Sequence, residues 1–274
     1  MRLFKATRAI TALAAMATSL SVPAYAAGDL LVAPTRVVMN GARGTEVILN
    51  NIGDEAATYR ISLQLLRMKA DGSVEEIESD AANAQEALAL GMISYAPRRI
   101  VLAPNQPQSI RIGVRPPVGL PDGEYRAHML FRAIPDAKAV TAGDGAKEGV
   151  SISLTPIYGI TIPIIVRQGA LAATAAIKSA RIVEGDVNPL LVLDMERSGT
   201  RSTYGRIRVT KAGVAKPVFE ARGLAIYADV SKRQVRLPLD PVSLAQLSGP
   251  VKIEYLEDVD AGGALIAELS TVIR

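Results

Sequence analysis

The chain has 274 residues, a formal net charge of +4, one histidine and no cysteine. The absence of cysteine excludes thiolate catalysis, cysteine-ligated zinc and thiol redox chemistry, and it excludes stabilisation by disulfides. Hydrophobic residues make up 49% of the sequence, so one or two domains can be held together by burial alone.

The N-terminus is typical of a secretory signal peptide. Three basic residues precede an apolar run over 9–20, and small residues at Ala24 and Ala26 predict cleavage after Ala26. The run is shorter than the roughly 20 residues of a spanning helix, which disfavours the alternative of an uncleaved anchor. Loss of residues 1–26 leaves 28 basic and 27 acidic residues. The exported chain is therefore nearly neutral, and its charge gives no argument for nucleic-acid binding.

From Leu30 onward, short segments rich in β-branched residues alternate with Gly, Pro, Asn and Asp, a pattern that predicts strands. In the first half we predict strands over 30–39, 45–50, 57–68, 93–102, 108–115, 124–134 and 150–167. An alanine-rich stretch over 82–90 predicts one helix. Seven strands joined by turns favour an immunoglobulin-like β-sandwich.

A second series of strands follows an alanine-rich connector. We predict strands over 177–184, 190–197, 204–211, 217–227, 233–239, 251–257 and 265–273, and a helical turn within 241–249. The fold class is therefore all-β, with two consecutive immunoglobulin-like sandwiches joined at an angle. We expect an N-terminal domain over 27–167, a linker over 168–175 and a C-terminal domain over 176–274.

The segment 150–167 differs from the other predicted strands in its length and pattern. Its even positions are apolar, while most of its odd positions are small or polar, which predicts a strand with one apolar face. Pro156 and Pro163 lie inside it. Because proline cannot donate to a strand ladder, we expect an unpaired side or a bulge near each of them. An ordinary sandwich strand with one buried face is the alternative interpretation.

The sequence carries no recognisable catalytic motif. His128 is the single histidine, and it lies on a predicted strand with no second histidine to share a metal. There is no G-x-S-x-G elbow and no glycine-rich phosphate loop after a strand. We therefore expect no enzyme activity, no metal, no cofactor and no small-molecule substrate.

Four stretches of the sequence form a recognisable set. The first two are APTRVVMNG, at 33–41, and LNNIGDEAATYRISL, at 49–63. The third is LPDGEYRAHMLFRAIP, at 120–135, which ends in an Arg-x-Ile-Pro signature. The fourth is the strand 150–167, which ends in Val166 and Arg167. Together they resemble the periplasmic pilus-assembly chaperones, the PapD-like family of two-domain immunoglobulin-like proteins.

The resemblance implies a function by strand addition. In that family the long seventh strand is lent to a pilus subunit that lacks a strand of its own sandwich. Val150, Ile152 and Leu154 are the side chains expected to fill the subunit's groove. The resemblance further implies a periplasmic location and delivery of subunits to an outer-membrane usher. A donor strand also predicts that residues 150–154 of the free protein are either unpaired on one side or paired with a second copy, which would be self-association through the edge strand.

The resemblance also implies two charged sites. An arginine and a lysine of the family anchor the subunit's C-terminal carboxylate; Arg36 matches the arginine, whereas Thr161 occupies the lysine position, which is a departure from the pattern. An interdomain ion pair is expected between Arg167 and Asp258, an acidic residue of the segment EYLEDVDAGG at 254–263. Two alternatives stay open at this point: a structural or adhesive surface protein that donates no strand, and a chaperone relative that serves another exported client.

Overall fold

The computed structural model describes residues 30–41, 43–135 and 157–273. Its first half contains ten strands: β1 (Leu30–Ala33), β2 (Val37–Asn40), β3 (Thr45–Asn51), β4 (Ala57–Met68), β5 (Val74–Ile77), β6 (Ile93–Ala96), β7 (Arg99–Leu102), β8 (Gln108–Val114), β9 (Gly123–Ile134) and β10 (Gly159–Gln168). A 3-10 turn, η1 (Ser79–Ala81), and the helix α1 (Ala84–Met92) lie between β5 and β6.

These strands form two sheets that enclose one core. One sheet has the order β1–β3–β8–β6, and the other has the order β2–β10–β9–β4–β5, with β7 also paired to β4. Tyr59, Phe131 and Ile164 are among the fully buried side chains between the two sheets. In every strand of the two sheets except β5, residues that alternate along the strand point into this core, as the period of two requires.

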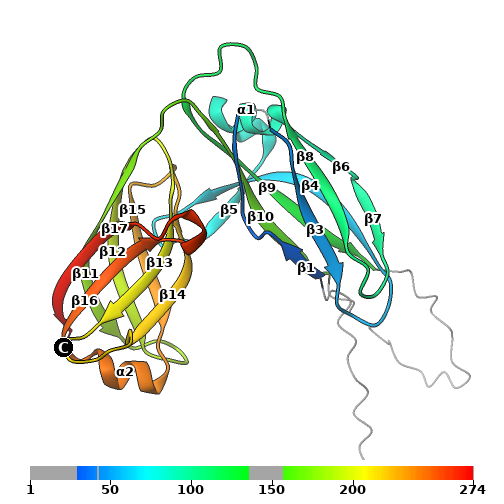
Figure 1. The fold of residues 1–274 in the computed structure, drawn as a ribbon. Helices are drawn as coiled ribbons and strands as arrows, with labels where there is room; N and C mark the ends of the chain where they lie inside the picture. The colour runs from blue at the N-terminus through cyan, green and yellow to red at the C-terminus, as the bar shows by residue number, and fades with distance from the viewer. Residues whose placement is uncertain (1–29, 42, 136–156, 274) are drawn as a thin grey trace, which may run out of the picture.

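The second half contains β11 (Ala173–Val183), β12 (Leu190–Gly199), β13 (Thr203–Thr210), β14 (Phe219–Ile226), β15 (Lys232–Pro238), β16 (Gly249–Glu257) and β17 (Leu265–Ile273). A short helix, α2 (Pro241–Leu247), and a 3-10 turn, η2 (Val259–Ala261), complete it. The sheets β11–β12–β15 and β14–β13–β16–β17 enclose a separate core that includes Leu193, Ile253 and Tyr255. Both sandwiches, and the angle at which they meet, are visible in Figure 1. The all-β class with two sandwiches is confirmed.

The structure differs from the prediction in three places in the first half. The predicted strand 30–39 is divided into β1 and β2, which belong to different sheets, and 93–102 is divided into β6 and β7. A proline, Pro34 or Pro97, lies in each interruption, where no backbone N–H is available for a ladder. The strand β5 was not predicted, because its sequence VEEI is mostly polar and exposed.

Helices and connections depart less from prediction. Helix α1 lies two residues later than the predicted 82–90 segment, and Asn83 and Glu86 form a capping box at its start. Only residues 169–172 separate β10 from β11, so the connection is shorter than the expected linker over 168–175. None of the helices in the described parts of the chain is long and apolar enough to cross a membrane.

Candidate functional site

The first half of β10 has an open edge. Strand β9 pairs antiparallel with β10 along its whole length, from Gly159 to Gln168. Strand β2 pairs with it in parallel, but only from Ile164 to Arg167. Within the described residues, therefore, no strand covers the second side of residues 159–163. Pairing with β2 begins directly after Pro163, which agrees with the unpaired side expected near that proline.

The two faces of β10 have different surroundings. Ile162, Ile164 and Val166 point into the core of the first domain. Ile165, on the opposite face, packs with Met68, Ala225 and Tyr227 in a small apolar cluster that joins the two domains. We call the side of this sheet that carries Ile165 the elbow face, because the second domain packs against it. The residues of β9 that lie on the elbow face alternate with core residues and are Glu124, Arg126, His128, Leu130 and Arg132.

A buried carboxylate links the two domains at the end of β10. Glu124 accepts hydrogen bonds at Oε2 from Arg167 Nε, at 3.0 Å, and from the backbone N and Oγ of Ser202, at 3.1 and 2.9 Å. The Glu124 side chain is 1% exposed. Ser202 belongs to the second domain, so this single carboxylate holds the last residues of β10 against the neighbouring sandwich.

Arg36 completes this group from the start of β2. Its Nη2 donates to Ser202 Oγ at 3.3 Å, and its guanidinium lies over the Tyr204 ring, 4.4 Å from the ring centre. Burial and the charge of Arg167 lower the pKa of Arg36. Its Nε is buried and has no hydrogen-bond partner within the described part of the chain. Arg36 is thus a cation without a carboxylate of its own.

A second ion pair joins the domains beside this group. Arg126 donates to both carboxylate oxygens of Asp229, at 2.9 and 2.8 Å, and its guanidinium stacks over Tyr227 at 3.8 Å. Asp229 also accepts from the backbone N of Met68 at 2.6 Å. Burial opposes ionisation of Asp229, but these hydrogen bonds and the charge of Arg126 outweigh it, and the pKa of Asp229 is lowered.

His128 is buried in the same region and stays neutral at ordinary pH. Its ring meets the Tyr227 ring edge to face, with centroids 6.1 Å apart. Burial, together with the charge of Arg126, lowers the pKa of His128 to about 3, although Asp229 acts in the opposite direction. It therefore has a structural place between the domains, and the described residues contain no cluster of side chains that could hold a metal.

The predicted site residues are only partly brought together. Arg36 lies at the elbow, where it contacts Ser202, whereas Thr161 lies on the open part of β10, and the two residues form no hydrogen bond with each other. Arg167 pairs with Glu124, and the Asp258 side chain instead accepts from Val259 N at the start of η2. Glu124 and Ser202 therefore take the place assigned to Asp258, whose carboxylate is engaged in capping the turn. Val150, Ile152 and Leu154 lie outside the described residues.

Sequence reasoning missed three residues of the elbow: Glu124, Ser202 and Asp229. The signal for Glu124 was present, because it is the single acidic residue of β9 and is in phase with Arg126 and His128. Nothing local marks Ser202 or Asp229, which lie in turns of the second domain.

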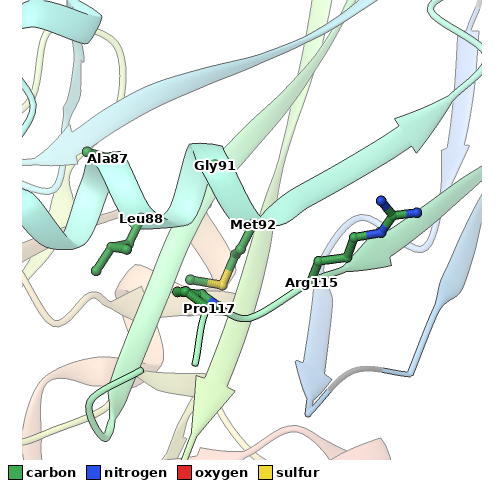
Figure 2. Close-up of a pocket in the computed structure, with 6 residues that line it drawn as sticks. All are labelled: Ala87, Leu88, Gly91, Met92, Arg115 and Pro117. Carbon is green, nitrogen blue, oxygen red and sulfur yellow. The ribbon is translucent and has the colours of Figure 1, made fainter. Parts of the chain in front are cut away.

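A shallow cavity of about 370 Å³ lies between α1 and the chain that follows β8. Figure 2 shows Met92 extending toward Pro117, and the remaining lining residues are Ala87, Leu88, Gly91 and Arg115. Gln85 of α1 donates to the carbonyl of Glu124 at 2.7 Å, so the helix supports the elbow end of β9. The cavity is mostly apolar and offers no reactive group.

No family model matches the sequence, and no curated protein matches it. Several solved structures are similar. The YadV chaperone is 13% identical, with 89% of this chain and 100% of that chain covered and a TM-score of 0.44. The Salmonella enterica SafA pilin in complex with the SafB chaperone gives 18% identity, coverages of 89% and 95% and a TM-score of 0.43.

The CsuC–CsuE chaperone–tip adhesion subunit complex of Acinetobacter baumannii gives 14% identity, coverages of 90% and 98% and a TM-score of 0.42. Each of the three structures is less than 20% identical to this chain, with a TM-score below 0.5.

Proposed function

We propose that this protein is a periplasmic chaperone that binds a newly exported pilus subunit by lending it the strand 150–167, and that delivers the subunit to an outer-membrane usher. The observation that carries the proposal is the open edge of β10 over residues 159–163. A strand with unpaired N–H and C=O groups can accept a further strand, whose backbone hydrogen bonds fix the register.

The residues just before β10 support strand addition. Ile157 and Tyr158 are each 51% exposed, although both are large and apolar. Val150, Ile152 and Leu154 continue the even-numbered apolar series that, in β10, contains Ile162 and Ile164. Burial of each such side chain in a client's groove would contribute about 1.5–3 kcal/mol before ordering costs. Three buried side chains can therefore account for most of the free energy of binding to the client.

Arg36 is suited to bind the C-terminal carboxylate of the client. It is a partly buried guanidinium with an unused Nε donor and no acidic partner among the described residues. A charge-assisted hydrogen bond would contribute about 1.5–3 kcal/mol. Because Thr161 supplies no charge, we propose that Arg36 anchors the carboxylate without the second cation that the family pattern provides.

This mechanism requires no cofactor and no nucleotide. The strand is held in the complex by packing and hydrogen bonds, so a segment of the next subunit that packs better can displace it. The subunit's groove stays covered until that exchange takes place, which protects an incomplete sandwich from aggregation.

A pull-down from a periplasmic extract of the host tests the function. Tagged wild-type protein is compared with Ile152→Asp, Arg36→Ala and the control Val118→Asp, which changes a fully exposed apolar residue away from the strand. We expect wild type and the control to recover a small β-rich subunit, and Ile152→Asp to recover none. Recovery of the same partners by all four proteins would overturn the proposal in favour of a structural module. Recovery of a strand-dependent partner that is not a pilus subunit would identify a different exported client.

A further inference from the structure

Three arginines form a line across the sheet at the end of the elbow face farthest from Glu124. Arg132 of β9 lies directly opposite Arg60 of β4, and Arg60 lies directly opposite Arg99 of β7. Residues opposite one another in antiparallel strands point to the same face and lie about 5 Å apart. All three side chains are exposed. We call Arg132, Arg60 and Arg99 the arginine row.

The arginine row has no counter-charge of its own. No ion pair or hydrogen bond to a carboxylate involves these arginines in the described parts of the chain. Their neighbours on the same face, one step along each strand, are uncharged: Thr58, Ser62, Val101, Leu130 and Ile134. Like charges directly opposite in a sheet are destabilising, so folding alone gives no reason for this arrangement.

The row begins beside the open edge. Arg132 is paired with Gly159, the first residue of β10, so the line of arginines runs away from the point at which an added strand would start. From this juxtaposition we infer that the arginine row binds acidic side chains of the client that is held on β10. The inference rests on the proposed function, and it adds a charge requirement for the choice of client.

This contact is distinct from the carboxylate anchor at Arg36. The pairing of β2 with β10 places Arg36 beside Pro163, four residues along β10 from Gly159 and two strands from Arg132. Four residues of strand span about 13 Å. One carboxylate cannot contact both sites, so the row recognises a second acidic group within the body of the client. Acidic protein is favoured over nucleic acid, because the chain without residues 1–26 carries 28 basic and 27 acidic residues and is nearly neutral.

The first test needs no client. A fluorescein-labelled peptide of alternating glutamate and threonine is titrated with the purified protein, and its affinity is read from fluorescence anisotropy. We expect Arg60→Glu to weaken binding about tenfold, because an attraction is replaced by a repulsion. The matched control is Arg111→Glu on β8, which makes the same charge change on the other sheet and should alter the affinity by less than about twofold.

Two further arms identify the ligand class. Replacement of the glutamates of the peptide by glutamine should abolish the difference between wild type and Arg60→Glu, and about 0.5 M NaCl should remove most of the binding. Equal binding of the acidic peptide to wild type and Arg60→Glu would overturn the inference. Tighter, row-dependent binding of a labelled oligothymidine than of the peptide would overturn it in favour of a polyanion site.

The client itself provides the second test. Pull-downs compare wild type, Ile157→Asp just before β10, Arg60→Glu and Arg111→Glu, with washes of increasing NaCl. We expect Ile157→Asp to lose the client, and Arg60→Glu to lose it at a lower salt concentration than Arg111→Glu. Loss with Ile157→Asp, but equal retention by the two arginine variants, would overturn the arginine row and leave the function intact. Retention by Ile157→Asp would count against strand donation, and the peptide titration would still decide the row.

Discussion

The arginines of the elbow face form two groups with opposite surroundings. Arg126 and Arg167, near the second domain, contact Asp229 and Glu124 and are 10% and 20% exposed. The three arginines of the row, at the other end of the same sheet, are exposed and have no carboxylate partner within the described residues. A paired, buried charge fixes the position of the element that carries it, whereas an unpaired, exposed charge is free to meet a partner. The same residue type thus holds the domains at one end and is proposed to recognise a client at the other.

In this comparison, the largest change in the free energy of unfolding is expected on replacement of Glu124. Replacement by alanine removes the acceptor of Arg167 and Ser202 and leaves a partly buried guanidinium uncompensated. We expect Glu124→Ala to lower the free energy of unfolding by about 3–5 kcal/mol, measured by urea denaturation. Glu268→Ala, which breaks an exposed pair with Lys252, should cost less than about 1 kcal/mol. Equal losses in the two variants would show that the elbow carboxylate is not a structural link.

The pH dependence of stability tests the burial of His128. Its pKa is about 3 in the folded protein and about 6.5 when unfolded, so between these values only the unfolded chain gains the proton. Stability should therefore fall as the pH drops below 6.5, by about 2–3 kcal/mol at pH 4.5 from this residue alone.

The variant His128→Phe keeps an aromatic ring but removes the titration. Its unfolding free energy should decrease less than that of wild type between pH 7 and pH 4.5, measured by urea denaturation at both values. Because the chain has one histidine, no other imidazole contributes to this difference. Parallel pH profiles for the two proteins would mean that His128 is accessible to solvent in the folded state.

Variants of Asp229 and Asp258 distinguish the interdomain ion pair seen in the structure from the one expected from the sequence. Asp229→Ala removes both hydrogen bonds from Arg126 and should cost about 2 kcal/mol, with a wider range of domain angles in small-angle X-ray scattering. Asp258→Ala removes only a cap of η2 and should cost about 1 kcal/mol or less, with unchanged scattering. A changed scattering curve for Asp258→Ala alone would support the ion pair between Arg167 and Asp258 that was expected from the sequence.

The smallest expected change in stability is an increase. Arg60→Thr removes the central charge of the arginine row and the repulsion with Arg132 and Arg99. We expect the free energy of unfolding of the free protein to rise by about 0.2–1 kcal/mol, measured by urea denaturation at low salt, and the gain to disappear at high salt. A loss of stability in this variant would mean that Arg60 has a structural partner, and the contrast between the two groups of arginines would not hold.

Much of the fold could be predicted because it depends on local patterns. The alternation of β9 predicts which of its residues face the core, and the asparagine and glutamate at the start of α1 form a capping box. The divisions at Pro34 and Pro97 were missed because a proline interrupts a ladder without indicating that the chain then joins another sheet. The partner of Arg167 was wrongly assigned to Asp258 because no local pattern specifies which carboxylate is brought close by packing.

The sequence by itself determined the strand pattern, the alternation of apolar residues over 150–167, and the places of Arg36 just before β2 and Arg167 near the end of β10. These features follow from residue type and a period of two, which act within a few residues. Only the tertiary structure decided that β2 covers residues 164–167 of β10 alone, that Glu124 and Asp229 join the domains, and that Arg132, Arg60 and Arg99 lie side by side across three strands. The physical reason is that strand register and domain packing bring together residues up to 166 positions apart, whose proximity depends on the whole fold.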